Sequence, residues 1–279
     1  MSRARKEESQ VVDSLQNASV RRARALERDR ALRERLKTYI AWGRHIAQEA
    51  LASRAPIRQA FVGPRLLETD EGRDIYRQLR DLGVPLHRVT TRVLESVVEG
   101  CGDQGVLLLA ARPEQDLARI LGMPPTLVLA AHGVQDPGNI GSILRSARAL
   151  GVSGLIALEG CADPFGSRAV RAAMGTLFSL PVVATPAARF LEALRGTGYH
   201  LVAADPAGTE SPDAIDLARP TALMLGNEGA GLPRQLLERA ERRVRIPMAP
   251  GVTSLNVHAA AAALLYEAAR QRGFVFGPR

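Results

Sequence analysis

Three segments in the second half of the chain combine glycines with polar side chains at points where helices are expected to begin. The first segment, residues 135–145, contains an Asp-Pro-Gly turn, then Asn139, which is placed to cap a helix, and then Arg145 within that helix. Arg148 follows about one helical turn later and close to the same face. Two guanidinium groups beside a glycine-containing turn suit contacts with phosphates, although a capped helix with solvated arginines has the same pattern.

The second segment, residues 225–233, reads LGNEGAGLP and places three glycines within six residues directly after an apolar run. Glycines at such positions let the backbone approach a ligand closely and present its N–H and C=O groups. The spacing is neither GxGxxG nor a Walker loop, because no Lys-Ser or Lys-Thr pair follows, and this counts against a dinucleotide or ATP site. Glu228 is either a carboxylate of a ligand site or a cap for a helix that begins near Pro233.

The third segment, residues 246–257, is rich in proline and glycine and leads into a helix that begins at Ser254 or Asn256. The free N–H groups of a helix N-terminus, together with small hydroxyl and amide side chains, orient polar ligands well. Ser254 is therefore a candidate for the site, an ordinary N-cap, or both.

A scaffold must bring these segments together, and the apolar pattern from residue 126 onward predicts one. Strands are expected at residues 126–131, 154–158, 181–184, 200–204, 221–225 and 243–246. Helices are expected at residues 139–150, 167–178, 187–196, 233–240 and 254–272. This alternation predicts an α/β fold with a parallel sheet covered by helices on both faces. Ligands of such sheets bind at the carboxyl ends of the strands, where all three segments are expected.

A small α/β module is expected before this domain, over residues 39–113, and a linker carrying a short helix follows it over residues 114–125. Apolar runs predict strands at 58–62, 86–89 and 105–111 and a helix at 74–82. A further helical stripe is expected from Ile40, Ile46, Ala47, Ala50 and Leu51. Residues 1–38 are expected to form a basic helical extension, with one helix over residues 19–38 that is either mobile or ordered on RNA.

The chain is basic, with 37 Lys and Arg against 29 Asp and Glu and a net charge of +8. Residues 1–37 hold eleven basic and six acidic residues, so five of the eight excess charges lie in the extension. This excess indicates a polyanionic partner, with Arg22 and Arg24 as candidate RNA contacts. A solvated helix laced with salt bridges would also be rich in charge.

The remaining composition is typical of a globular cytoplasmic protein without a membrane partner. No apolar run approaches the roughly 20 residues that span a bilayer, and no apolar stretch follows the basic N-terminus as a secretory signal requires. Cys101 and Cys161 lack the spacing of metal ligands, so we expect two reduced thiols and no metal site.

Taken together, the three segments resemble the motifs of the SpoU (TrmH-like) branch of the SPOUT RNA 2′-O-methyltransferases. Asn139 with Arg145, the GNEGAGLP loop, and IPM followed by SLNV are together highly specific, and the resemblance covers about residues 126–272. The sequences GRHIAQEAL at 43–51 and QGVLLLA at 104–110 are similar to the family's L30e-like RNA-binding domain, with less specificity.

The resemblance implies an α/β SPOUT domain over residues 126–279 whose chain is threaded into a deep trefoil knot. Knots are rare among protein folds, so this expectation rests on the family alone. The resemblance also implies a homodimer, with an interface partly formed by the last helix through Leu255, Ala259, Ala262, Ala263 and Tyr266. The implied cofactor is S-adenosyl-L-methionine, in a pocket formed by Leu225, Gly226, Gly229, Ile246, Met248 and Leu255. The implied catalytic positions are Asn139, Arg145, Glu228, Ser254 and Asn256.

The implied reaction is methylation of a ribose 2′-hydroxyl in structured RNA. Ribosomal (23S) RNA is the preferred substrate, because the module and the basic extension suit a large folded RNA. Arg145 would orient the ribose or a phosphate, and a role as general base is costly for a guanidinium with a pKa above about 12. Arg148, Arg168 and Arg171 are further candidate RNA contacts. Ala173 stands where relatives often have Ser, so a hydrogen bond from that serine is missing.

Three alternatives remain open at this point. The first keeps the family but makes transfer RNA the substrate. The second is an RNA-binding or assembly protein without activity, against which the polar motif positions speak. The third is an unrelated nucleotide-dependent α/β enzyme, which would bind ATP or NAD in place of S-adenosylmethionine.

Overall fold

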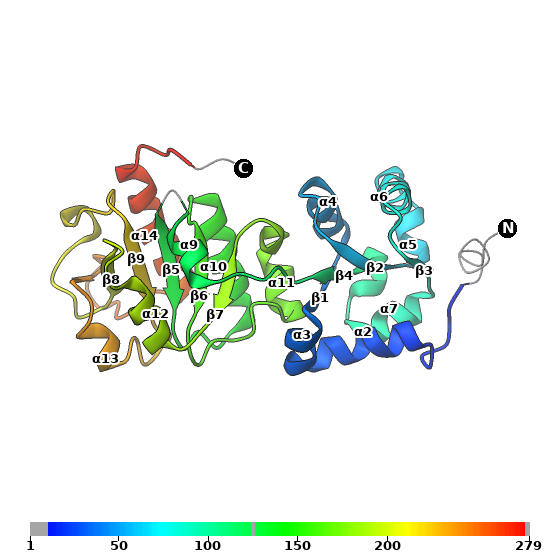
Figure 1. The fold of residues 1–279 in the computed structure, drawn as a ribbon, viewed down its shortest axis with the longest axis horizontal. Helices are drawn as coiled ribbons and strands as arrows, with labels where there is room; N and C mark the ends of the chain where they lie inside the picture. Colours follow the sequence, from blue (N-terminus) through cyan, green and yellow to red (C-terminus); the bar gives the residue numbers. More distant parts are fainter. Residues whose placement is uncertain (1–10, 124–125, 277–279) are drawn as a thin grey trace. The chain divides into compact units, whose positions relative to one another are not determined.

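The computed structural model describes residues 11–123 and 126–276, which form two compact units. Unit 1 comprises Met1–Glu114 and Phe165–Ser179, and unit 2 comprises Gln115–Pro164 and Leu180–Arg279 (Figure 1). The chain therefore passes between the units three times, after residues 114, 164 and 179. The first ten residues of the predicted basic extension lie outside the described residues.

Unit 2 is built on a six-stranded sheet whose neighbouring strands are all parallel. The order is β10-β8-β9-β5-β6-β7. Strand β5 therefore lies between β6, the next strand in the sequence, and β9, which is much later in the sequence. The strands are β5 (Leu127–Ala131), β6 (Gly154–Ala157), β7 (Val182–Ala184), β8 (His200–Ala204), β9 (Thr221–Leu225) and β10 (Arg242–Val244). Each matches a predicted strand to within a few residues. The predicted parallel sheet is confirmed, whereas the knot stays a prediction.

Helices lie on both faces of this sheet, as Figure 1 shows. Side chains from alternate positions of β5, β6, β8 and β9 pack in one apolar cluster with α9, α12 and α13. Helices α10 and α14 pack against each other on the opposite face. The helices of unit 2 are α9 (Leu117–Leu121), α10 (Pro137–Ala149), α12 (Ala187–Leu194), α13 (Arg234–Leu237) and α14 (Val257–Gln271), with a 3₁₀ turn η2 (Pro212–Ala214). Among the described helices of the chain, none has the length and apolar content to cross a membrane.

Unit 1 contains a four-stranded mixed sheet in the order β1-β4-β2-β3. Strand β4 is antiparallel to both β1 and β2, and β3 runs parallel to β2. The strands are β1 (Thr38–Trp42), β2 (Ile57–Val62), β3 (Leu86–Arg88) and β4 (Val106–Ala111). The helices that precede and connect them are α2 (Ala18–Arg28), α3 (Arg30–Leu36), α4 (Arg44–Ala52), α5 (Pro64–Leu67), α6 (Asp70–Asp81), α7 (Thr91–Val97) and α8 (Cys101–Gln104).

The predicted helical stripe that began at Ile40 is wrong in its first part. Ile40 lies in strand β1, and the helix starts only at Arg44. The break falls at Gly43, whose φ of +104° is open to glycine and strained for other residues. The short apolar run before Gly43 therefore pairs with β4 instead of extending the helix.

The described part of the predicted basic extension, residues 11–38, is part of unit 1. The single helix expected over residues 19–38 is divided into α2 and α3 at Asp29, whose backbone is extended and whose side chain caps α3 by accepting from the N–H of Leu32. Val20, Ala23 and Leu26 of α2 are fully buried in the same apolar cluster as β1 and α7. The apolar side of α2 is thus part of the hydrophobic core of unit 1.

The segment Phe165–Ser179 leaves the unit 2 sheet between β6 and β7 and belongs to unit 1. It forms α11 (Ser167–Ala173) and η1 (Thr176–Phe178), not the single helix predicted over residues 167–178. Met174 and Gly175 both have positive φ, and this ends α11. The rings of Phe165 and Phe178 lie 5.2 Å and 6.2 Å from that of Tyr39 on β1. Residues 165–179 of the domain expected over residues 126–279 therefore pack within unit 1.

Candidate active site

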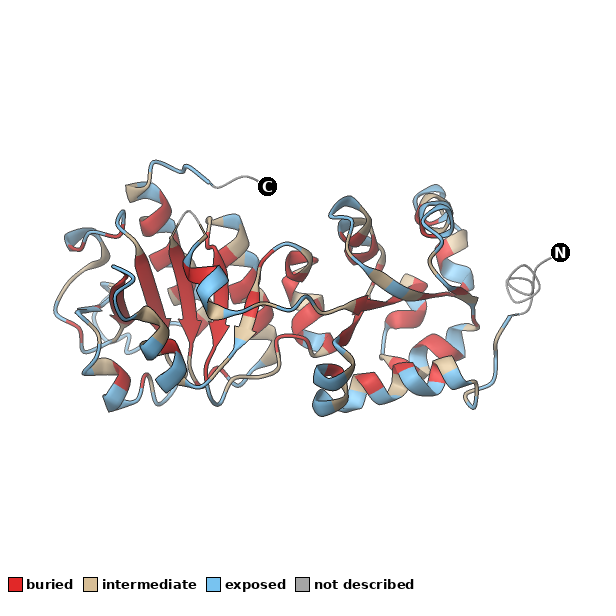
Figure 2. Cartoon of the chain, viewed as in Figure 1, coloured by how far each residue is buried: buried red, intermediate tan, exposed pale blue. Residues whose placement is uncertain are grey.

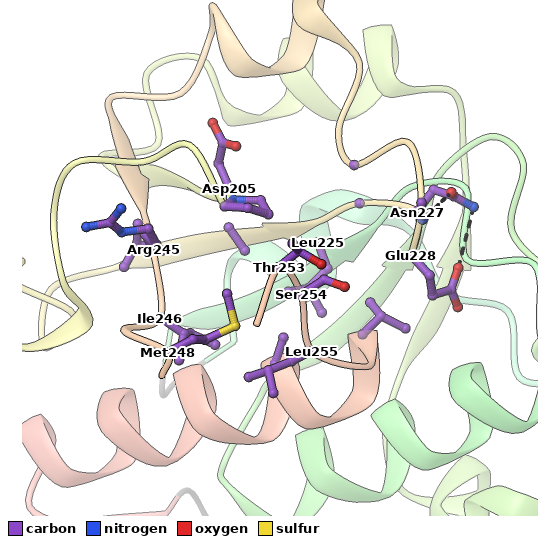
Figure 3. Close-up of a pocket in the computed structure, with 18 residues that line it drawn as sticks. Asp205, Leu225, Asn227, Glu228, Arg245, Ile246, Met248, Thr253, Ser254 and Leu255 are labelled. Atoms are coloured by element: carbon purple, nitrogen blue, oxygen red, sulfur yellow. Dashed lines mark hydrogen bonds between the residues drawn. The ribbon is translucent and has the colours of Figure 1, made fainter. Parts of the chain in front are cut away.

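A cavity of about 370 Å³ opens at the carboxyl ends of β8, β9 and β10 in unit 2 (Figure 3). Small-molecule sites commonly measure about 300–1,000 Å³, so the cavity has the size of a small-ligand site. All six residues predicted to hold a cofactor line it: Leu225, Gly226, Gly229, Ile246, Met248 and Leu255. The second and third motif segments thus form the walls of one cavity, as the sequence predicts for loops at the carboxyl edge of the sheet.

The loop after β9 approaches its own backbone very closely at Gly226. A β-carbon at this position would lie 2.2 Å from the carbonyl carbon of Gly231 and 2.4 Å from the nitrogen of Leu232. The loop is closed by two reciprocal hydrogen bonds, from Asn227 N to Gly231 O at 3.0 Å and from Gly231 N to Asn227 O at 2.9 Å. Only glycine fits at residue 226, and the loop has one compact shape.

The side chain of Asn227 organises this loop, a role that was not predicted from the sequence. Its Oδ1 accepts hydrogen bonds from the backbone N–H groups of Gly229 and Ala230, both at 2.9 Å. Its Nδ2 donates to the carbonyl of Gly133 at 2.8 Å and so ties the loop to the segment after β5. The asparagine within a glycine-rich run was the available signal, because asparagine side chains often bond the backbone two residues on.

One chain of hydrogen bonds joins the three motif segments. Asn139 on α10 donates from Nδ2 to Glu228 Oε1 at 2.7 Å, and its Oδ1 accepts from Asn256 Nδ2 at 3.1 Å. These residues are up to 117 positions apart in the sequence. Glu228 is a carboxylate of this network and not a cap for α13, which begins after Pro233 without a side-chain cap. Three of the five predicted catalytic residues are therefore in direct contact.

Two predicted helix caps differ from those in the structure. Asp136 caps α10 by accepting from the N–H of Asn139, so Asn139 is not the cap and its side chain is left for Glu228 and Asn256. Asn256 caps α14 through Oδ1, which accepts from the N–H groups of His258 and Ala259. Ser254 is not a cap: it is exposed and lines the cavity.

Arg145 lies on α10, exposed, with no hydrogen bond or ion pair to any described residue. It is not among the residues that line the cavity. Arg148 lies on the same helix and is half-buried. The guanidinium of Arg145 is therefore available to a partner molecule, while α10 holds its backbone in place through Asn139.

The other predicted RNA contacts belong to unit 1. Arg22 and Arg168 are exposed, and Arg24 is half-buried, with an Nε that has no hydrogen-bond partner among the described residues. Arg171 is half-buried and its guanidinium lies 4.3 Å from the ring centre of Trp42, a cation–π contact within the unit. Arg171 thus has a packing role that competes with the predicted RNA contact.

Two charged residues that the sequence does not predict for the site, Asp205 and Arg245, also line the cavity. Figure 3 shows Asn227 and Glu228 toward one end and Asp205 and Arg245 toward the other. Asp205 accepts from Nε of Arg243 at 2.7 Å, which holds this nearly buried carboxylate. No spacing in the sequence links Asp205 to the motif segments, since it follows β8 and meets them only in the folded sheet.

The lining suits S-adenosylmethionine, the cofactor implied by the resemblance. Leu225, Ile246, Met248 and Leu255 supply apolar walls for a flat ring, and the loop around Gly226 exposes backbone polar groups at its edge. Two carboxylates and one guanidinium line the cavity, so its charge is compatible with a sulfonium cation. The residues present therefore fit the cofactor.

Comparisons with known proteins agree with this geometry. Residues 126–266 match the SpoU rRNA methylase family, and residues 40–116 match the RNA 2′-O ribose methyltransferase substrate-binding domain. An uncharacterized tRNA/rRNA methyltransferase of Mycobacterium tuberculosis is 37% identical over 86% of this chain and 83% of its own length. The 23S rRNA (guanosine-2′-O)-methyltransferase RlmP of Bacillus subtilis is 29% identical over 91% of this chain and 97% of its own.

A solved structure extends the likeness to the whole fold. The AdoMet-bound rRNA methyltransferase from Sinorhizobium meliloti aligns with a TM-score of 0.82 and 30% identity, over 94% of this chain and 97% of that one. The resemblance inferred from the three motif segments is thereby confirmed. The chain belongs to the SpoU rRNA methylase family.

Proposed function

We propose that this chain transfers a methyl group from S-adenosyl-L-methionine to a ribose 2′-hydroxyl of ribosomal RNA, with 23S rRNA as the substrate. The observation that carries the proposal is the cavity lined by the second and third motif segments, with Glu228, Asn139 and Asn256 joined by hydrogen bonds beside it. Relatives named for 23S rRNA 2′-O-methylation support the choice of substrate, and such a substrate implies a cytoplasmic protein.

The residues of the cavity would hold and orient the donor. Leu225, Ile246, Met248 and Leu255 would cover its apolar parts, and backbone groups of Gly226 and Gly229 would bind its polar edge. The bound donor supplies an already activated methyl group, so the protein has mainly to align the attacking oxygen with it. The hydrogen bonds of Asn227 keep the loop in one shape before the donor arrives, which lowers the cost of binding.

Arg145 would bind the RNA side of the reaction. Its guanidinium can donate a forked pair of hydrogen bonds to a phosphate or to the ribose and can offset negative charge that develops on the attacking oxygen. A guanidinium gives up a proton at too high a cost to be an efficient base, so we assign it an orienting role. Glu228 and Asn256 would fix Asn139, and through it the start of α10.

The active form is proposed to be a homodimer. α14 presents Ala259, Ala263 and Tyr266 to solvent on one face, and Leu255 before it is 40% exposed. Small residues on a helix face allow close packing of a second helix. Sedimentation of the purified chain should give twice the monomer mass, and Tyr266→Lys should shift the protein toward monomers. A wild-type monomer at micromolar concentration would contradict the dimer.

The reaction can be tested with methyl-labelled S-adenosylmethionine and transcripts of 23S, 16S and transfer RNA. We expect incorporation into 23S rRNA, at a ribose that blocks primer extension at low nucleotide concentration. Incorporation into transfer RNA alone would favour the alternative substrate. Donor binding without incorporation into any RNA would leave an RNA-binding protein. Binding of ATP or NAD in place of the donor would exclude the family reaction.

Arg145→Ala is the sharpest variant for the proposed role. Because the side chain has no described partner, its removal should leave the melting temperature and donor affinity unchanged and lower the transfer rate by at least about 100-fold. Arg234→Ala is the matched control, since Arg234 is exposed on α13 and paired with Glu238 outside the site. Near-full activity of Arg145→Ala would refute the role.

A further inference from the structure

The outward face of α2 in unit 1 consists only of arginine and alanine. With about 100° between successive residues, the buried positions Val20, Ala23 and Leu26 lie on one side of the helix. The exposed positions on the other side are Ala18, Arg21, Arg22, Ala25 and Arg28. Figure 2 shows this alternation of buried and exposed positions along α2. We call Arg21, Arg22 and Arg28 the α2 arginine face.

The three arginines have no acidic partner among the described residues. By contrast, six arginines elsewhere on unit 1 are paired with nearby carboxylates: Arg30 with Glu34, Arg65 with Glu68, Arg73 with Asp70, Arg77 with Asp74, Arg80 with Asp81, and Arg92 with Asp13. The α2 arginine face is therefore a local excess of positive charge, whereas α6 carries the same kind of side chain in neutral pairs.

The acidic residues closest in sequence are already engaged. Glu27, the one acidic residue of α2, is half-buried, and its carboxylate accepts a hydrogen bond from the hydroxyl of Ser167 on α11. Asp29 accepts from the N–H of Leu32 as the cap of α3. Burial raises the pKa of Glu27. Among the residues that the structure describes, no carboxylate therefore neutralises the charge of the face.

The geometry of the face fits a phosphate backbone. Arg21 and Arg28 are two turns apart, about 10 Å along the axis, and Ala25 lies between them. The small alanine side chains let a strand of nucleic acid approach the helix, and the long arginine side chains can reach phosphates on either side. Unpaired like charges on one helix repel one another, and a bound polyanion removes that cost.

The same face lacks what a protein or a membrane would need. Large apolar side chains with substantial exposure occur elsewhere in the described chain, at residues such as Leu82 and Tyr266, and none is on α2. Protein interfaces depend on buried aromatic and aliphatic anchors, and surface-bound membrane helices depend on an exposed apolar stripe. Because the α2 arginine face offers charge without apolar anchors, a nucleic acid is a better partner for it than a protein or a membrane.

We propose that the α2 arginine face binds phosphates of the RNA substrate. This rests on the proposed function, because it gives unit 1 a second substrate contact. Helix α2 lies before residues 40–116, the segment that matches the substrate-binding domain, but its apolar side packs in the core of that domain. The position of the face is therefore held by the domain core.

The test compares two triple variants of the full chain. Arg21→Gln, Arg22→Gln and Arg28→Gln remove the unpaired charges together, and Arg73→Gln, Arg77→Gln and Arg80→Gln remove three paired charges from α6 as the matched control. Glutamine has a helix propensity close to that of arginine, so both helices should persist. Affinity for a 23S rRNA transcript is measured across a salt series, beside melting temperature and S-adenosylmethionine binding.

Loss of three phosphate contacts should lower the slope of log affinity against log salt by about 2–3, and affinity at about 0.1 M salt by at least roughly 100-fold. The α6 variant should keep its affinity to within about threefold, and donor binding should be unchanged in both. Equal losses in both variants, or no loss in the α2 variant, would overturn the proposal. An equal loss of affinity for polyglutamate would also overturn it, since the face would then bind any polyanion.

The outcome separates this proposal from the proposed function. If the wild-type chain binds the transcript through the α2 arginine face but transfers no methyl group to any RNA, the proposed reaction fails and the binding surface stands. If transfer occurs and the α2 variant retains full RNA affinity and rate, the reaction stands and the binding surface fails.

Discussion

Replacement of Gly226 by alanine tests whether the shape of the loop after β9 is essential. The added β-carbon would lie 2.2 Å from the carbonyl carbon of Gly231, whereas ordinary contact begins at 3.4 Å, so the two must separate by about 1.2 Å. The atoms it meets are backbone, so no side-chain rotation relieves the clash. The reciprocal hydrogen bonds between Asn227 and Gly231 would be stretched or broken.

The cost can be worked from these contacts. Overpacking of this kind costs about 1–3 kcal/mol, and weakened hydrogen bonds add about 1 kcal/mol each. With two hydrogen bonds affected the total is about 3–5 kcal/mol, which for a unit of this size corresponds to a fall in melting temperature of roughly 6–20 °C. A displacement near 1 Å at a positioned group commonly costs about 100-fold in rate. We therefore expect weaker donor binding and transfer reduced by roughly that factor.

Calorimetric titration with S-adenosylmethionine, thermal unfolding and initial rates measure the three effects separately. Gly229→Ala is the control for stability, because a β-carbon there would lie 3.6 Å from Asn227 Oδ1, an ordinary contact in the same loop. The reasoning fails if Gly226→Ala binds the donor as tightly as the wild type and melts at the same temperature. It also fails if Gly229→Ala is destabilised as strongly.

Two further predictions concern side chains that were not recognised from the sequence. Asn227→Asp keeps the acceptor for Gly229 and Ala230 but loses the donor to Gly133 and places a carboxylate next to that carbonyl. Urea unfolding should show that the free energy of unfolding falls by about 1–3 kcal/mol. Unchanged stability would show that the hydrogen bond to Gly133 is unimportant. Burial raises the pKa of Glu27 above its usual 4.5, so the stability linked to its protonation is present below that pH and is lost as pH rises through the higher folded value. Glu27→Gln should therefore melt above the wild type at neutral pH, with the difference disappearing near pH 4, and the exposed and paired Glu34→Gln serves as control; a lower melting temperature for Glu27→Gln at pH 7 would contradict this.

The strands of unit 2 could be predicted because they are apolar on both faces. Runs such as residues 127–131 and 221–225 are completely buried, and burial on both faces leaves a continuous apolar signal bounded by turn residues. Strand β1 was missed because five residues directly before a helix show no alternation that separates them from it. The strand ends and the helix begins at Gly43, which has a positive φ. A glycine allows this backbone conformation but does not impose it, so the sequence does not predict it.

The six residues predicted to hold a cofactor line one cavity, but the hydrogen bonds that connect the motif segments could not be predicted. Asp136 and Asn139 are both good capping residues three positions apart, and sequence spacing alone does not decide between them. The structure decides it because Asn139 meets Glu228, which is 89 residues away. Contacts of this range depend on the order of strands in the sheet, and the same reason hid Asp205 and the packing of Phe165 on Tyr39.

Residues 165–179 belong to unit 1 although they lie between two segments of unit 2, and this limits where the chain can be cut into stable fragments. A fragment that stops at residue 114 would lose the two phenylalanines that pack on Tyr39 and would expose the surface they cover. A fragment that starts at residue 115 would carry α11 with its apolar side, including Ala169 and Val170, open to water. Units 1 and 2 therefore cannot be produced as independent fragments by a single cut. After proteolysis in the 114–125 connection, the chain would still link the two units at residues 164 and 179.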